Sequence, residues 1–195
     1  MSKRPQNPKN NNSRTSVLSG TQIVLGVCGG IAAYKVPELV RSLCKKGAEV
    51  TCVLTENGAR FVTALTLSTL SGNRVYADMF DESVRDIEHI SLAKKADIIV
   101  VAPATADAIA RFAGGRAEDL LSSVILAAQS PVLICPAMNE RMWLHPATKE
   151  NTEKLKRYGY YFVEPLKGLL ACGDTGIGKL AAIDNIEDKI ADILG

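Results

Sequence analysis

Residues 22–47 read QIVLGVCGGIAAYKVPELVRSLCKKG and contain a strand signal, a turn signal and a helix signal in that order. The first seven letters are almost continuously apolar, which is typical of a strand buried on both faces of a parallel sheet. Gly29 and Gly30 end this run, and apolar residues then recur at helical spacing until Gly47. This unit predicts an α/β fold that begins with a parallel strand.

The same alternation of strand-like and helix-like segments continues along the chain. Further strands are expected at residues 49–54, 97–102, 131–135 and 160–163, and helices at 57–70, 87–95, 107–112, 118–128 and 147–158. Continuous apolar strands separated by helices predict a three-layer, doubly wound parallel sheet of the Rossmann or flavodoxin type. Beyond Glu164 the glycines are too dense for a regular element, and we expect a loop or flap there.

The composition is that of one ordinary globular domain, with 195 residues, 47% of them hydrophobic and 23% charged. A net charge of +2 argues against broad electrostatic capture of nucleic acid. Residues 1–20 are polar and predict a disordered tail, so the domain is expected at residues 21–195. The sequence contains no signal peptide or membrane-spanning run, which predicts a cytoplasmic protein without a membrane partner.

The cysteines and histidines do not form a metal-binding pattern. The five cysteines, at positions 28, 44, 52, 135 and 172, are an odd number without a CxxC pair, which indicates reduced thiols. Those at 28, 52 and 135 lie in strand-like runs and are expected to be unreactive core residues. His89 and His145 lack the spacing of a site such as HExxH, so no metal is expected. His145 is expected near a helix start, and an isolated residue such as His89 is often a packing residue.

The glycine turn and the end of the second strand favour a bound mononucleotide. Gly29 and Gly30 let backbone N–H groups approach an anion where a helix starts. The turn matches neither GxGxxG nor the P-loop pattern. At the end of the second strand Thr55 stands where dinucleotide-binding folds usually have an acid, and a hydroxyl suits a phosphate better than a ribose diol. We therefore predict FMN rather than NAD, with a simple strand–helix turn as the alternative.

The stretch CPAMNERMW at residues 135–143 follows a strand at the edge where ligands bind in such sheets. The side chain of Asn139 donates and accepts hydrogen bonds without charge, which suits a carboxylate that leaves as CO2. The alternative is a loop whose Met142 and Trp143 only cover the sheet.

Two other segments carry polar groups next to small residues. Pro103–Ala108 follows the most apolar strand and leaves room for a flat ring, unless Asp107 simply caps a helix. The glycine-rich segment near residues 165–183 carries Cys172 and Lys179 and predicts a flexible clamp. An accessible thiol there could close over a ligand and donate a proton, whereas the alternative is a connection with an incidental cysteine.

Taken together, these segments resemble the flavin-dependent cysteine decarboxylases over roughly residues 22–183. The family motif PxMNxxMW matches in full at residues 136–143, and its active-site histidine matches His89 in the context His-Ile-Ser-Leu. The family's substrate clamp, ACGxxGxG followed by a basic residue, matches Ala171 to Lys179. Three separate motifs in the family's order make the resemblance specific.

The resemblance implies roles for individual residues. It implies FMN contacts at Gly29, Gly30, Ile31, Thr55, Thr105, Ala106, Asp107, Ala108 and Ala137. It implies substrate contacts at Asn139, Met142, Ala171, Gly173 and Lys179. Two positions depart from the family, because Asp107 stands where asparagine is common and Lys179 where arginine is common, which replaces a bidentate contact by a point charge.

The resemblance is greatest to the family members of coenzyme A biosynthesis, which implies decarboxylation of 4′-phosphopantothenoylcysteine to 4′-phosphopantetheine. The substrate thiol would be oxidised to a thioaldehyde with His89 as the base. Loss of CO2 would then give an enethiolate, and Cys172 would supply a proton in the final reduction. FMN would carry the redox chemistry.

Other activities stay open beside this one. A peptidyl-cysteine decarboxylase of lantibiotic maturation is disfavoured by Cys172, and a flavin prenyltransferase by Asn139 and Cys172. A non-catalytic flavoprotein that regulates a phosphatase is disfavoured by the same residues together with His89. The resemblance also implies a homotrimer or a dodecamer of trimers. Many bacterial relatives continue into a synthetase domain, which nothing in this sequence resembles.

Overall fold

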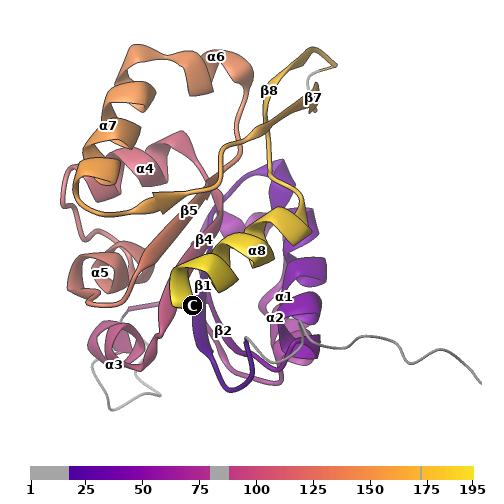
Figure 1. Cartoon of the computed structure of the whole chain (residues 1–195), viewed down its shortest axis with the longest axis vertical. Helices are drawn as coiled ribbons and strands as arrows, with labels where there is room; N and C mark the ends of the chain where they lie inside the picture. Colours follow the sequence, from indigo (N-terminus) through magenta and orange to yellow (C-terminus); the bar gives the residue numbers. More distant parts are fainter. Residues whose placement is uncertain (1–17, 80–87, 172) are drawn as a thin grey trace, which may run out of the picture.

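The computed structural model describes residues 18–79, 88–171 and 173–195. Within them, a parallel sheet has the strand order β3-β2-β1-β4-β5-β6 (Figure 1). The strands are β1 (Gln22–Val27), β2 (Glu49–Leu54), β3 (Val75–Tyr76), β4 (Ile98–Ala104), β5 (Val132–Pro136) and β6 (Tyr161–Phe162). The doubly wound parallel sheet predicted from the sequence is confirmed.

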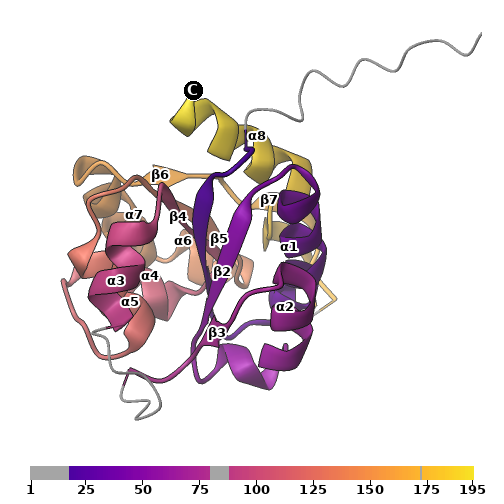
Figure 2. The ribbon, with the colours of Figure 1, turned by 90° about the horizontal axis from the view of Figure 1, so that it is seen from below.

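Helices cover both faces of the sheet and complete the three layers (Figure 2). One face carries α1 (Val36–Lys45), α2 (Ala64–Ser71) and α8 (Ile183–Leu194). The other carries α3 (Glu88–Lys95), α4 (Ala106–Ala113), α5 (Leu120–Ala127) and α7 (Pro146–Arg157). Three short helices, η1 (Ile31–Lys35), η2 (Gly58–Arg60) and α6 (Glu140–Leu144), lie in the connections.

The two sides of each central strand pack into two different hydrophobic clusters. In β1, Ile23 and Leu25 belong to the cluster under α1 and α8, whereas Val24 belongs to the cluster under α3, α4 and α5. In β4, Ile98 and Ile99 divide between the clusters in the same way. Because successive side chains point to opposite faces and both faces are covered, both sets must be apolar. This explains the unbroken apolar runs in the sequence.

The position of the binding edge follows from the strand order. β1 lies between β2 and β4, so the connections that leave its neighbours run to opposite faces of the sheet. In open α/β sheets a crevice forms outside the carboxyl ends of the strands at such a switch point. The turns after β1, β4 and β5 therefore meet at one edge.

The segment after Glu164 differs from the predicted loop. Strands β7 (Leu166–Leu169) and β8 (Thr175–Lys179) form a separate antiparallel pair, and α8 follows. Glycine does not prevent this ladder, because its hydrogen bonds need only the backbone. The sequence analysis also missed β3, α6 and α8.

The helix expected at residues 57–70 is interrupted. η2 ends at Arg60 and α2 starts only at Ala64, because Thr63 caps α2 by accepting a hydrogen bond from Thr66 N at 3.1 Å.

The predicted boundary of the N-terminal tail needs a small correction. Leu18 is only 3% exposed and belongs to the cluster under α1. Gly20 N donates to Gly47 O at 2.9 Å, so residues 18–20 belong to the folded domain. The rest of the predicted tail, residues 1–17, lies outside the described residues. Across the part of the chain that is described, none of the helices is long and apolar enough to cross a membrane.

Candidate active site

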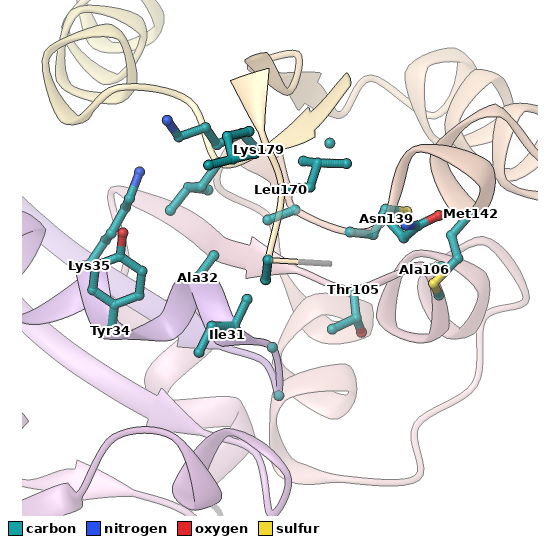
Figure 3. A pocket seen from close by; sticks show the side chains of 18 residues that line it. Ile31, Ala32, Tyr34, Lys35, Thr105, Ala106, Asn139, Met142, Leu170 and Lys179 are labelled. Carbon is teal, nitrogen blue, oxygen red and sulfur yellow. The ribbon is translucent and has the colours of Figure 1, made fainter. Parts of the chain in front are cut away.

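A cavity of about 550 Å³ lies at the carboxyl edge of the sheet (Figure 3). Its walls come from η1, the turn between β4 and α4, the turn between β5 and α6, and the β7–β8 hairpin. Residues predicted as site residues that line it are Gly29, Gly30, Ile31, Thr105, Ala106, Ala137, Asn139, Met142, Ala171 and Lys179. The fold thus brings together segments that are up to 150 residues apart in the sequence, from Gly29 to Lys179.

The floor of this cavity is built from small residues. A Cβ atom at Gly29 would collide with Asn57, so the backbone there admits no side chain. Thr105 stands at the start of α4, and its hydroxyl accepts a hydrogen bond from Ala108 N at 3.2 Å. Thr105 therefore caps the helix. The alternative in which Asp107 is the cap is wrong, because α4 begins at Ala106 and already contains Asp107 in its first turn.

The turn after β5 places Asn139 and Met142 in the cavity wall (Figure 3). The side-chain oxygen of Asn139 accepts a hydrogen bond from Arg141 N at 2.9 Å and caps α6. Trp143 is 2% exposed, and Lys149 Nζ lies 3.9 Å from the centre of its ring. Trp143 is therefore buried, whereas Met142 is 49% exposed and lines the cavity.

The hairpin and η1 form the remaining walls. Lys179 and Leu170 come from the hairpin, and Tyr34 and Lys35 face them from η1 (Figure 3). Lys35 was missed by the sequence analysis, although it ends the quoted turn GGIAAYK. η1 ends at Lys35 and places this residue at the cavity. Cys172 lies outside the described residues.

A second cavity, of about 810 Å³, adjoins the first and shares Gly29, Thr105 and Met142 with it. Besides Gly29 and Thr105, it contains two further predicted cofactor residues, Thr55 and Asp107. The hydroxyl of Thr55 donates to Val27 O at 3.2 Å and accepts from Gly58 N at 3.0 Å. Thr55 therefore also shapes the turn after β2.

Arg111 balances part of the negative charge in the second cavity. Its guanidinium lies 2.9 Å from Asp107 Oδ2 and 2.6 Å from Asp119 Oδ2. Burial tends to raise the pKa of Asp119, but hydrogen bonds from Ser122 and the charge of Arg111 outweigh this and lower it. The aspartate that replaces the family's asparagine at position 107 is thus paired with a cation.

Several predicted residues lie away from both cavities. In the described part of the chain, His89 is partly buried on α3 and lines neither cavity. Ala108 is buried in α4, and Gly173 lies in the hairpin connection. His145 caps α7 by accepting from Ala147 N at 3.2 Å, which confirms its expected place at a helix start.

The three cysteines expected in the core are buried there. Cys28, Cys52 and Cys135 are 2%, 0% and 0% exposed. Burial raises the pKa of Cys28 to about 12 and that of Cys52 to about 12, and it raises the pKa of Cys135 as well. Because only a thiolate is a strong nucleophile, these thiols are unreactive in the folded chain.

A protein-family model described as Flavoprotein matches residues 11–195, a range that includes every described element. The coenzyme A biosynthesis bifunctional protein CoaBC of Mycolicibacterium smegmatis is 47% identical over 165 residues, which are 85% of this chain and 40% of that protein. CoaBC of Bacillus subtilis is 46% identical over 171 residues, which are 87% of this chain and 42% of that protein. The chain spans less than half the length of these relatives.

Solved structures are similar over nearly their whole length. A cysteine-to-serine mutant of PPC decarboxylase complexed with pantothenoylaminoethenethiol has 29% identity and a TM-score of 0.79, with 88% of this chain and 96% of that chain covered. The FMN-dependent cysteine decarboxylase SpaF has 30% identity and a TM-score of 0.81, with 91% and 97% covered. The FMN binding protein AtHal3 has 30% identity and a TM-score of 0.75, with 87% and 94% covered.

Proposed function

Because the chain belongs to the flavoprotein family, we propose that it catalyses the FMN-dependent decarboxylation of 4′-phosphopantothenoylcysteine to 4′-phosphopantetheine in coenzyme A biosynthesis. The observation that carries this proposal is the cavity in which Asn139, Thr105 and Lys179 meet at the carboxyl edge of the sheet. The 47% identity to a CoaBC protein and the likeness to PPC decarboxylase support this reaction.

FMN fits the floor that the two cavities share. Gly29 and Thr105 line both cavities, and the small residues Gly30, Ala106 and Ala137 line the first. A flat ring needs such close access to the backbone. When bound, FMN supplies a two-electron acceptor that takes electrons from the thiol-bearing carbon of the substrate and later returns them.

The residues of the first cavity would bind and orient the substrate. Asn139 would hold the carboxylate without adding charge, so that it leaves as neutral CO2. The apolar side chains of Ile31, Met142 and Leu170 would exclude water from it. Lys35 and Lys179 would attract the negatively charged substrate to the cavity.

His89 would act as the base across a contact between subunits. On its own chain it lines neither cavity formed by the described residues, which favours a role in the cavity of a neighbouring copy. We therefore propose a homotrimer, alone or within a dodecamer, in which His89 of one subunit reaches the cavity of the next. The proposed enzyme is cytoplasmic and acts on a small molecule.

Cys172 would donate the proton that completes the reaction. Ala171 lines the first cavity, so the chain next to Cys172 belongs to the site. Thiols are acidic enough to protonate a carbon centre near neutral pH, which a serine hydroxyl is not.

The test is to incubate the purified protein anaerobically with 4′-phosphopantothenoylcysteine and to follow CO2 and the mass of the product. A peptide with a C-terminal cysteine serves as the competing substrate, because SpaF is a cysteine decarboxylase of similar fold. Release of CO2 and formation of 4′-phosphopantetheine are expected, together with free FMN after denaturation. Turnover of the peptide alone, or release of FAD instead of FMN, would overturn the proposal.

A further inference from the structure

One carboxylate joins the β7–β8 hairpin to the turn that carries Asn139. Glu140 Oε1 accepts a hydrogen bond from Ile177 N at 2.8 Å. Two residues earlier in the sequence, Met138 N donates to Gly178 O at 2.9 Å. Strand β8 is thus bonded to the residues on both sides of Asn139.

The two glycines of β8 make room for these two contacts. A Cβ atom at position 176 would lie 2.5 Å from Glu140 Cδ and 2.6 Å from its Oε2. A Cβ atom at position 178 would collide with Met138 O, and Gly178 has a φ of 155°, which side chains rarely adopt. Glycine at both positions lets strand β8 approach the turn that carries Asn139 closely, which explains why these two positions have no side chain.

The hairpin needs such a fastening because it is separate from the main sheet. β7 pairs only with β8 among the described strands, and an isolated two-stranded hairpin is marginally stable in water. Leu169 and Leu166 are 68% and 38% exposed, so the hairpin has little core of its own. A hydrogen bond to an ionised acceptor is roughly twice as strong as a neutral one.

We propose that Glu140 is a positioning residue that holds the β7–β8 hairpin over the substrate cavity. Its carboxylate fixes β8 to the turn of Asn139, and this sets where Leu170 and Lys179 stand relative to the amide. The effect on substrate rests on the proposed function, whereas the fastening of the hairpin does not. Glu140 touches no reacting atom in this role.

The first test compares Glu140→Ala, Glu140→Gln and the control Glu150→Ala, which removes an exposed glutamate of α7. Hydrogen exchange of residues 166–179 reports the fastening, and affinity for 4′-phosphopantetheine reports its effect on the site. Glu140→Ala should increase exchange in the hairpin and weaken product binding about tenfold, the size expected for one charged hydrogen bond. Melting temperature and FMN content should stay at wild-type values. Glu140→Gln should restore part of both properties, because its neutral amide oxygen accepts the same bond at roughly half the strength.

A second test uses Gly176→Ala, whose new methyl group would push against the carboxylate of Glu140. Alone, this variant should loosen the hairpin as Glu140→Ala does. In the double variant the clash is absent, so the two effects should not add.

The proposal would be overturned by unchanged hairpin exchange in Glu140→Ala, by equal damage in Glu140→Gln, or by additive effects in the double variant. Loss of FMN with general melting in Glu140→Ala would also overturn it, since the carboxylate would then support the whole fold. If the wild-type chain fails to bind 4′-phosphopantetheine, the proposed function fails. The hydrogen-exchange data would then still show, independently of that function, whether Glu140 holds the hairpin in place.

Discussion

Asn139 serves the fold and the proposed chemistry from one position. Its oxygen caps α6, and the residue lines the cavity. In Asn139→Asp the carboxylate also caps a helix well, so folding and FMN binding should persist. A second negative charge against the substrate carboxylate should lower decarboxylation by roughly 100-fold or more, as loss of a key donor does. Thermal unfolding and CO2 release check this prediction, and near-parental turnover would remove Asn139 from the mechanism.

Cys172 can be tested by separating the two halves of the reaction. If it only donates the final proton, Cys172→Ser should still oxidise and decarboxylate the substrate. Because a serine hydroxyl is a far weaker acid than a thiol, the last reduction should fail. Mass spectrometry of an anaerobic single turnover should show a product two hydrogen atoms lighter than 4′-phosphopantetheine, by the balance of that missing step. Formation of the saturated product at the parental rate would exclude Cys172 as the donor.

Predictions for single residues succeeded where one property of the surrounding sequence decides whether the residue is buried. Cys28, Cys52 and Cys135 were expected to be buried because their whole runs are apolar, and they are. Capping depends on the residue at which the helix begins, which apolar spacing does not locate. Asp107 was therefore considered as the cap of α4, whereas in the structure Thr105 caps this helix.

Among the elements, the long apolar strands were predictable and the short or glycine-rich ones were not. β2 matches its expected range at Glu49–Leu54. β8 could not be predicted from its sequence TGIGK, since its position depends on distant contacts with Met138 and Glu140. Lys35 was missed for a related reason, because it ends η1, and apolar spacing predicts neither η1 nor its place at the cavity.

The start of α5 offers a test of local stability at the second cavity. Asp119 accepts from Ser122 N at 2.7 Å, and Ser122 Oγ accepts from Asp119 N at 3.0 Å, which is a reciprocal cap. Asp119→Ala should lower the free energy of unfolding by about 1–2 kcal/mol at pH 7. Urea denaturation measures this change, with Asp119→Asn as the variant that keeps an acceptor.

The same cap predicts a pH dependence. The folded state lowers the pKa of Asp119 below its ordinary value of 3.8, so its ionised form stabilises the fold above that value. This contribution is lost as the pH falls through the lower folded pKa. The difference between wild type and Asp119→Ala should therefore shrink in acid, and a difference that grows would contradict the assignment.

The whole molecule should lose stability in alkali because its buried thiols stay protonated. Unfolding would let Cys28, Cys52 and Cys135 ionise near their ordinary pKa of 9.0, whereas burial raises the pKa of each in the folded chain. Stability is therefore retained below pH 9 and falls above it, by about 1.4 kcal/mol per pH unit for each thiol. Urea denaturation at pH 8 and pH 10 measures the slope. Replacing Cys52 by alanine should reduce it, and an unchanged slope would contradict the prediction.

The assembly of the molecule can be tested with two inactive variants. His89→Asn lacks the proposed base, and Asn139→Asp lacks the proposed carboxylate ligand, so each homo-oligomer should be inactive. If His89 of one subunit serves the cavity of another, mixed oligomers contain complete sites. They arise where a His89→Asn subunit supplies Asn139 and its Asn139→Asp neighbour supplies His89. Random mixing in equal amounts places these partners together at about one quarter of the contacts of a cyclic oligomer, so activity should return to about that fraction.

The mixing experiment needs co-expression or unfolding and refolding of both variants together, so that subunits exchange. A chain carrying both substitutions, co-assembled with His89→Asn, is the matched control, since no contact in it has His89. Activity in this control would exclude His89 as the base. No recovery in the first mixture, despite mixed oligomers seen by native mass spectrometry, would place the base within the same chain. Because His89 lies on α3, that result would require α3 to move toward the cavity edge when substrate binds.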